Sequence, residues 1–170
     1  MKLTSSQRRY LVLYQCLLPM LINIVVCGLI GAVDYRGLNT LPVLEPPKSV
    51  AVDLAATSFL LPFLTCLIAT PLVRRDIRRG TVSSLAKKDQ QPSAGLPPAR
   101  MPLLLRALLI GGTGAVVVGS AAMIVVSMLP VPTVAVSKFL FWKLTFAGFY
   151  GAAVTPFIAL LAMAEPAESL

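Results

Sequence analysis

Residues 10–33 read YLVLYQCLLPMLINIVVCGLIGAV, a stretch without a single charged side chain. About 20 consecutive apolar residues are enough for a helix to cross the ~30 Å hydrocarbon core of a bilayer. Three later stretches have the same length and character, and they cover residues 54–73, 107–129 and 144–163. The sequence therefore predicts an all-α, polytopic membrane protein with four transmembrane helices.

The composition of the whole chain agrees with a membrane protein. Of its 170 residues, 56% are hydrophobic and only 13% are charged, and the mean hydropathy is +0.81. Soluble domains carry about 25% charged residues, so the class of soluble globular proteins is excluded. Four spans and their connections use nearly all of the chain, which predicts a single domain over residues 1–170.

The basic residues are distributed unevenly between the predicted connections. Eleven of the fifteen lie before the first span or between the second and third, whereas four lie in the other connections: Arg36, Lys48, Lys138 and Lys143. Short loops rich in Lys and Arg stay on the cytoplasmic side of a membrane. We therefore expect an up-down-up-down bundle with both termini and the connector 74–106 in the cytoplasm.

The connector 74–106 begins with the segment RRDIRR at residues 74–79. If the second helix continues through it, positions four apart stack into a basic surface, and each such charge gains ~1 kcal/mol near anionic lipid. This predicts contact with anionic headgroups through Arg74, Arg75, Arg78 and Arg79. Residues 87–98 predict a flexible linker. No aromatic cluster or folded module accompanies these charges, so nucleic acid is not an expected partner.

Small and weakly polar residues recur every three or four positions in each apolar run. Helices in lipid associate through close backbone approach rather than through the burial of apolar bulk, so these stripes are expected to face inward. The stripes are Cys16, Pro19, Asn23, Cys27 and Gly31; Ala55, Ser58, Pro62, Thr65 and Ala69; Gly111, Gly112, Ala115, Gly119 and Ala122; and Gly148, Gly151, Thr155, Ala159 and Ala162.

Asn23 is the most polar side chain near the middle of a predicted span. An amide group is costly to leave without hydrogen-bond partners in hydrocarbon, so we expect Asn23 to face the bundle, toward Ser58, Thr65 or Thr155. A hydrogen bond that holds two helices together is one interpretation. The alternative is a path for a neutral solute, lined by Asn23, Thr65, Tyr150 and Thr155.

Charged residues also flank the spans on the predicted outer side, namely Asp34, Asp53, Lys138 and Lys143. We expect either an ion pair, such as Asp53–Lys138 or Asp34–Lys143, or a Lys143 side chain that extends to the headgroup region.

The residue types that usually carry a metal, a cofactor or covalent catalysis are scarce. The chain has no histidine, and its three cysteines all lie within predicted spans. We therefore expect no metal site, no cofactor and no disulfide framework. An enzyme would need an activated nucleophile or an acid–base pair, and ion-coupled carriers usually place charges within the membrane. Apart from cysteine and tyrosine, the predicted spans contain no ionisable residue.

These observations favour a non-catalytic membrane protein, such as a small scaffold, accessory subunit or assembly subunit of a membrane complex. The expected partners are membrane lipids, including anionic ones, and another membrane protein or a second copy of the chain. The alternative is a small oligomeric transporter or channel for a neutral or apolar solute. The lack of targeting features fits a bacterial cytoplasmic membrane.

Overall fold

The computed structural model describes residues 4–83, 85 and 101–165, and the predicted linker 87–98 lies outside them. Four helices in it are long and apolar enough to cross a membrane, which confirms that part of the prediction and indicates a multi-pass membrane protein. In chain order, the elements are α1 (Ser5–Val12), η1 (Leu13–Leu17), α2 (Leu18–Asp34), β1 (Thr40–Pro42), α3 (Val50–Arg78), α4 (Leu103–Gly114), η2 (Ala115–Gly119), α5 (Ser120–Ser127), β2 (Thr133–Ala135) and α6 (Val136–Met163).

The helices extend beyond the apolar runs that predicted them. The largest difference is in α6, which begins at Val136 rather than at residue 144. The charge of Lys143 led to the later start, yet Lys143 is buried inside the bundle. A charge can lie within a membrane helix when a partner on a neighbouring helix neutralises it.

Local sequence signals explain where several helices begin and end. The Thr4 side chain accepts a hydrogen bond from the backbone N–H of Gln7 (3.3 Å), and the Gln7 side chain accepts one from the backbone N–H of Thr4 (2.9 Å). Ser49 caps α3 through the N–H of Val52 (3.2 Å). After α3, Gly80 has a φ of 71°, a conformation that glycine adopts without strain.

The first long helix widens into the π-helical segment η1 just before Pro19. Proline has no N–H to donate to the carbonyl four residues earlier, which here belongs to Gln15. π-Helical turns are a common way for a membrane helix to absorb such a defect. The buried Gln15 side chain lies within this turn.

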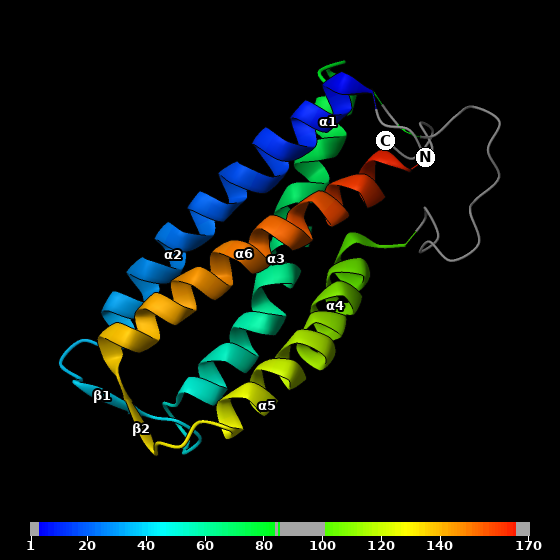
Figure 1. Ribbon diagram of the computed structural model, residues 1–170. Coiled ribbons are helices and arrows are strands. Elements are labelled where there is room, and N and C mark those ends of the chain that lie inside the picture. The colour runs from blue at the N-terminus through cyan, green and yellow to red at the C-terminus, as the bar shows by residue number, and fades with distance from the viewer. Residues whose placement is uncertain (1–3, 84, 86–100, 166–170) are drawn as a thin grey trace.

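The long helices are not packed in the order of the sequence. Extensive contacts join α6 to α2 and to α3, and α3 to α4, η2 and α5. The spatial order is therefore α2, α6, α3, α4, with the last helix lying between the first and the second, as Figure 1 shows.

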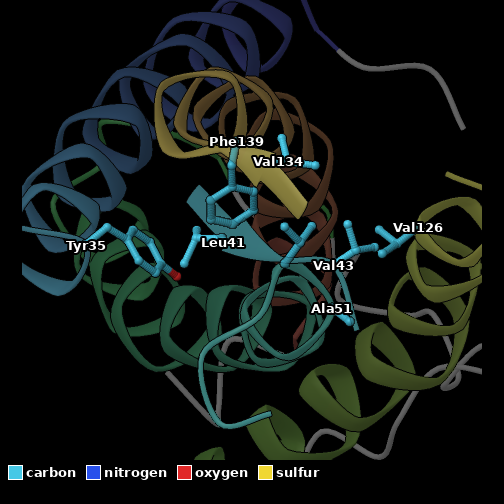
Figure 2. Packing of buried hydrophobic residues seen from close by; sticks show 8 residues of the cluster. Tyr35, Leu41, Val43, Ala51, Val126, Val134 and Phe139 are labelled. Atoms are coloured by element: carbon cyan, nitrogen blue, oxygen red, sulfur yellow. The ribbon is translucent and has the colours of Figure 1, made fainter. Parts of the chain in front are cut away.

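The loops after α2 and α5 meet at one end of the bundle, which we call the strand end (residues 35–50 and 128–136). Here β1 pairs antiparallel with β2, and Leu41 lies opposite Val134. Both residues belong to a buried cluster with Phe139, and Tyr35 contacts the edge of the Phe139 ring (centroids 5.6 Å apart). Figure 2 shows this cluster, which closes the strand end. The predicted all-α fold did not include this short sheet.

The first and last described residues meet at the opposite end (Figure 1), which we call the terminal end (residues 4–9, 74–83, 85, 101–106 and 163–165). The Gln7 side chain donates to the carbonyl of Ser83 (3.1 Å), and the backbone N–H of Leu85 donates to Met163 (2.8 Å). A buried cluster of Tyr10, Leu11, Val73, Val82, Ala159, Ala162 and Met163 fills this end.

Within the bundle, every member of the predicted small-residue stripes is buried or only partly exposed. Gly112 differs from the other glycines of the stripes in that a Cβ atom added there would meet nothing within 4 Å. The backbones of α4 and α3 approach each other closely. A Cβ atom added to Gly114 would lie 2.6 Å from the carbonyl oxygen of Ser58 and 2.9 Å from the Pro62 ring. Real side chains do not approach so closely, so the α3–α4 packing depends on glycine at position 114.

Candidate functional site

A groove with a volume of about 530 Å³ lies between α2 and α3. Large aliphatic side chains form its two walls, and Lys143 and Thr155 of α6 line its base. Several wall residues are half-exposed, including Ile22 (50%), Leu64 (49%) and Ile68 (60%). The groove therefore opens sideways, toward the surroundings of the bundle.

Hydrogen bonds between tyrosine and aspartate join the two walls near both ends of the groove. At the strand end, Tyr35 donates to Oδ1 of Asp53 (2.8 Å). At the terminal end, Tyr10 donates to Oδ2 of Asp76 (2.8 Å) and accepts a hydrogen bond from Gln15 (3.0 Å). α1 and α2 are thus tied to α3 at two levels, with the groove between them.

An ion pair lies at the strand end of the groove. Nζ of Lys143 donates to Oδ1 of Asp53 (2.7 Å), the same oxygen that accepts from Tyr35. Lys143 also lies over the Tyr35 ring, 5.5 Å from its centroid, and only 3% of the residue is exposed. Burial and the hydrogen bond to Asp53 raise the pKa of Tyr35, so its hydroxyl remains a donor at neutral pH.

This ion pair differs from both expected pairings. Asp53 binds Lys143 rather than Lys138, which is exposed. Asp34 is exposed and lines the groove, and Lys48 donates to its backbone carbonyl (3.1 Å). The amine of Lys143 is buried within the protein, against Asp53 and the Tyr35 ring.

Helical spacing explains why Lys143 points inward. Four-residue steps back from Thr155 lead through Gly151 and Ala147 to Lys143, and all four residues are buried. Lys138 lies off this stripe. The inward stripe predicted for the fourth span began at Gly148, because the helix was expected to start at residue 144. Extending the stripe would have placed Lys143 in the interior.

The groove brings together three of the four polar residues proposed for a solute path, namely Asn23, Thr65 and Thr155. The fourth, Tyr150, lies elsewhere and donates to the carbonyl of Ser58 (3.2 Å), beside Gly114.

Asn23 faces the bundle, as expected, but it lies against Gly151 rather than bonding to Ser58, Thr65 or Thr155. A Cβ atom at Gly151 would overlap the Asn23 amide. Nδ2 of Asn23 is buried and has no hydrogen-bond partner among the described residues. The hydroxyl of Thr155 donates within its own helix, to the carbonyl of Gly151 (2.8 Å).

A second buried charge cluster lies at the terminal end, and we call it the terminal clamp (Arg74, Arg106 and Glu165). Oε2 of Glu165 accepts from Nε of Arg74 (2.7 Å), and Oε1 accepts from Nη1 of Arg106. The Glu165 and Arg106 side chains are 2% and 4% exposed. The clamp joins α3, α4 and the residues that follow α6.

The terminal clamp was not predicted from the sequence. Glu165 follows the last apolar run, and its only signal is its position three residues after Ala162 of the inward stripe. The clamp includes one of the four arginines that were expected to contact anionic lipid. Arg74 is bound to Glu165, whereas Arg75, Arg78 and Arg79 are exposed.

Metal-ligating residues do not gather at either site. Within residues 4–83, 85 and 101–165, no three His, Cys, Asp or Glu side chains lie close enough together to hold a metal ion. The cysteines Cys16, Cys27 and Cys66 are not in disulfides. No protein-family model, curated protein or solved structure matches the chain.

Proposed function

We propose that the chain is a non-catalytic integral membrane protein, an accessory or assembly component that holds another constituent of the membrane in the groove between α2 and α3. The observation that carries this proposal is the shape of the groove. It is apolar along its walls, open to the side and bounded at both ends by hydrogen bonds between its walls. In a bilayer such an opening faces lipid, so the occupant would enter from within the membrane.

The pairing of the buried charges supports a structural role for them. Lys143 binds Asp53, and Arg106 binds Glu165, in each case across two elements. A general acid or base needs access to the proton that it transfers. A buried ion pair is instead suited to fixing which helices are neighbours.

The proposed topology places the terminal end in the cytoplasm of a bacterial cell. Support comes from the exposed arginines at this end, which are Arg8, Arg9, Arg75, Arg78 and Arg79. In a chain whose own cysteines are replaced, Ser137→Cys at the strand end should react with an impermeant maleimide added to intact cells. Thr81→Cys at the terminal end should react only after the cells are opened. The reverse labelling pattern would contradict this orientation.

Photo-crosslinking in native membranes tests the function of the groove. A photoreactive amino acid replaces Leu64 on the wall of the groove (49% exposed), and the control replaces Leu108 on α4 (45% exposed). We expect the tagged chain with the probe at position 64 to give one discrete adduct, identified by mass spectrometry, and to retain that constituent after mild detergent extraction. The proposal would be overturned if the probes at positions 64 and 108 gave the same heterogeneous mixture of adducts and the extracted chain were a monomer without a bound constituent.

Transport of a neutral or apolar solute is the second candidate. Its support is the convergence of Asn23, Thr65 and Thr155 on the groove. The bonds Tyr35–Asp53 and Tyr10–Asp76 favour a bound occupant over a path from one side of the membrane to the other. Solute flux into proteoliposomes that falls in Asn23→Leu would support transport. Flux equal to that of protein-free vesicles would eliminate it.

A further inference from the structure

We propose that the occupant of the groove is a phospholipid with an ammonium-bearing headgroup, one acyl chain of which lies between α2 and α3 while the headgroup meets Asp34 at the strand end. This inference rests on the proposed function, in which the groove holds a constituent of the membrane, and it names the chemistry of that constituent.

The volume of the groove is in the range of sites for small molecules. Its volume is about 530 Å³, within the roughly 300–1,000 Å³ range of small-molecule sites. A single extended hydrocarbon chain is a ligand of this class.

The lining matches a hydrocarbon chain along most of its length. Ile22, Val26 and Ile30 line the groove from α2, and Leu60 and Leu64 face them from α3. The charged side chains of the lining lie at the strand end, and they are Asp34, Asp53 and Lys143. An amphiphile would therefore bind with its polar part at this end and its chain directed toward the middle of the bundle.

The depth of the apolar section also fits one leaflet. Asn23 and Asp34 are separated along α2 by 11 residues, or about 16 Å at 1.5 Å per residue. This is close to half of the ~30 Å hydrocarbon core. A chain from the leaflet at the strand end would reach from Asp34 to the level of Asn23.

Charge at the mouth of the groove selects the headgroup. Two carboxylates, Asp34 and Asp53, line it with a single ammonium, that of Lys143, and this ammonium is already bound to Asp53. Among the described side chains that line the groove, the exposed carboxylate of Asp34 is therefore a charge without an ion-pair partner, which favours a cationic group. Lys48 lies beside it, donating to the Asp34 carbonyl (3.1 Å), where a phosphate would be attracted.

This preference is opposite to the one expected at the terminal end, where exposed arginines favour anionic lipids. The contrast makes the proposal specific. A chain with a net charge of +8 would enrich anionic lipid around itself without any built site, so enrichment of an ethanolamine lipid in the groove would not follow from overall charge.

The test uses the purified full chain in phosphatidylcholine vesicles that contain a few per cent of a photoreactive lipid. Phosphatidylethanolamine and phosphatidylglycerol probes carry the same diazirine in the middle of one acyl chain. We expect the ethanolamine probe to label residues 22–30 and 60–64 at least three-fold more than the glycerol probe does. Equal labelling by the two probes, or labelling spread evenly over α4 and α5, would overturn the proposal.

Two variants with matched controls separate the chain site from the headgroup site. Ile22→Trp fills the groove and should reduce its labelling several-fold, whereas Leu108→Trp on α4 should not. Asp34→Asn should abolish the ethanolamine preference but leave labelling in place, and Glu45→Gln, an exposed carboxylate of the same loop region, should change neither. All four positions are exposed, and unchanged melting of each variant verifies its fold. An Asp34→Asn chain that retains the preference would contradict the headgroup assignment.

The two proposals fail in different ways. A discrete protein adduct from position 64 in native membranes, together with no lipid preference in vesicles, would overturn the lipid inference and support the proposed function with a protein occupant. The absence of any discrete adduct in native membranes and of any selective labelling in vesicles would overturn both.

Discussion

The two sides of α3 differ in how closely the neighbouring helix approaches. On the side of α4, glycines allow contact between backbones, with Gly111 against Phe59 and Gly114 against Ser58. On the side of α2, aliphatic residues such as Ile22 and Leu64 face a groove. The open side is tied by two tyrosine–aspartate hydrogen bonds, and the closed side also has the terminal clamp.

The difference shows which residues bring membrane helices together. Both sides of α3 are apolar, but an apolar side chain gains nothing by exchanging lipid for another apolar side chain. Close packing requires small residues or polar bonds. Most residues of α2 that line the groove are large and aliphatic, so a space remains there that another molecule can fill. Four sets of variants test this comparison.

The largest expected effect is from Glu165→Gln, which removes the charge that neutralises the buried Arg106. Leaving a buried charge without its partner costs about 3–5 kcal/mol. The free energy of unfolding, measured by titration with a denaturing detergent, should fall by this amount, and Glu45→Gln should leave it unchanged. The double variant Arg106→Met, Glu165→Gln should recover part of the loss. If Glu165→Gln is as stable as the parent, the terminal clamp does not stabilise the packing of α3 against α4.

Gly114→Ala tests the close packing between α3 and α4. The added methyl group would overlap the Ser58 carbonyl and the Pro62 ring, and overpacking of this kind costs about 3 kcal/mol. Gly112 is the matched control, because a Cβ atom there meets nothing within 4 Å. Gly112→Ala should raise stability by roughly 0.5–1 kcal/mol through its higher helix propensity. Equal effects at the two positions would contradict the glycine-dependent contact.

Tyr35→Phe removes one tie across the open side. Asp53 then keeps Lys143 but loses the phenol donor, and a hydrogen bond to a charged group is worth about 1.5 kcal/mol. Tyr14→Phe is the control, since Tyr14 is exposed. The ethanolamine preference in the groove should also weaken in Tyr35→Phe, because the Asp53 carboxylate is less firmly placed. Identical unfolding curves for Tyr35→Phe and the parent would show that the hydrogen bond from Tyr35 to Asp53 does not stabilise the open side.

The smallest effect on stability is expected for Leu64→Ala on the wall of the groove. Leu64 is 49% exposed. Its side chain faces lipid, so truncating it removes contacts with lipid and does not leave a cavity in a protein interior. The change in the free energy of unfolding should stay below about 0.5 kcal/mol. A loss comparable to that of Gly114→Ala would indicate that the groove is closed in the membrane.

Much of the fold was predictable from the sequence, because the apolar runs identify the helices and the small residues identify their inward faces. The order of the helices was not predictable in the same way. A stripe such as Gly148, Gly151 and Thr155 specifies that α6 faces the interior, but it does not specify whether α2 or α4 lies opposite. That choice depends on how side chains on two helices fit together.

The candidate site was predicted only in part. Asn23, Thr65 and Thr155 meet because all three lie on inward faces at similar depths. Tyr150 does not join them, since its long side chain reaches across to the other side of α3. The partners of Lys143 and Glu165 were missed because charge was taken to mark the limits of the spans, whereas these charges are buried next to opposite ones. The strands β1 and β2 are only three residues each, too short to show an alternating pattern.

The position of α6 between α2 and α3 has a consequence for biosynthesis. The principal helical neighbour of the first span is the last one to be made, with roughly 100 residues between them. At 5–20 residues per second, α2 waits on the order of ten seconds before α6 leaves the ribosome. During that interval its polar residues, Asn23 among them, have no α6 to pack against. A nascent chain arrested before residue 136 should therefore be more readily degraded than the finished protein, which pulse-chase labelling would measure.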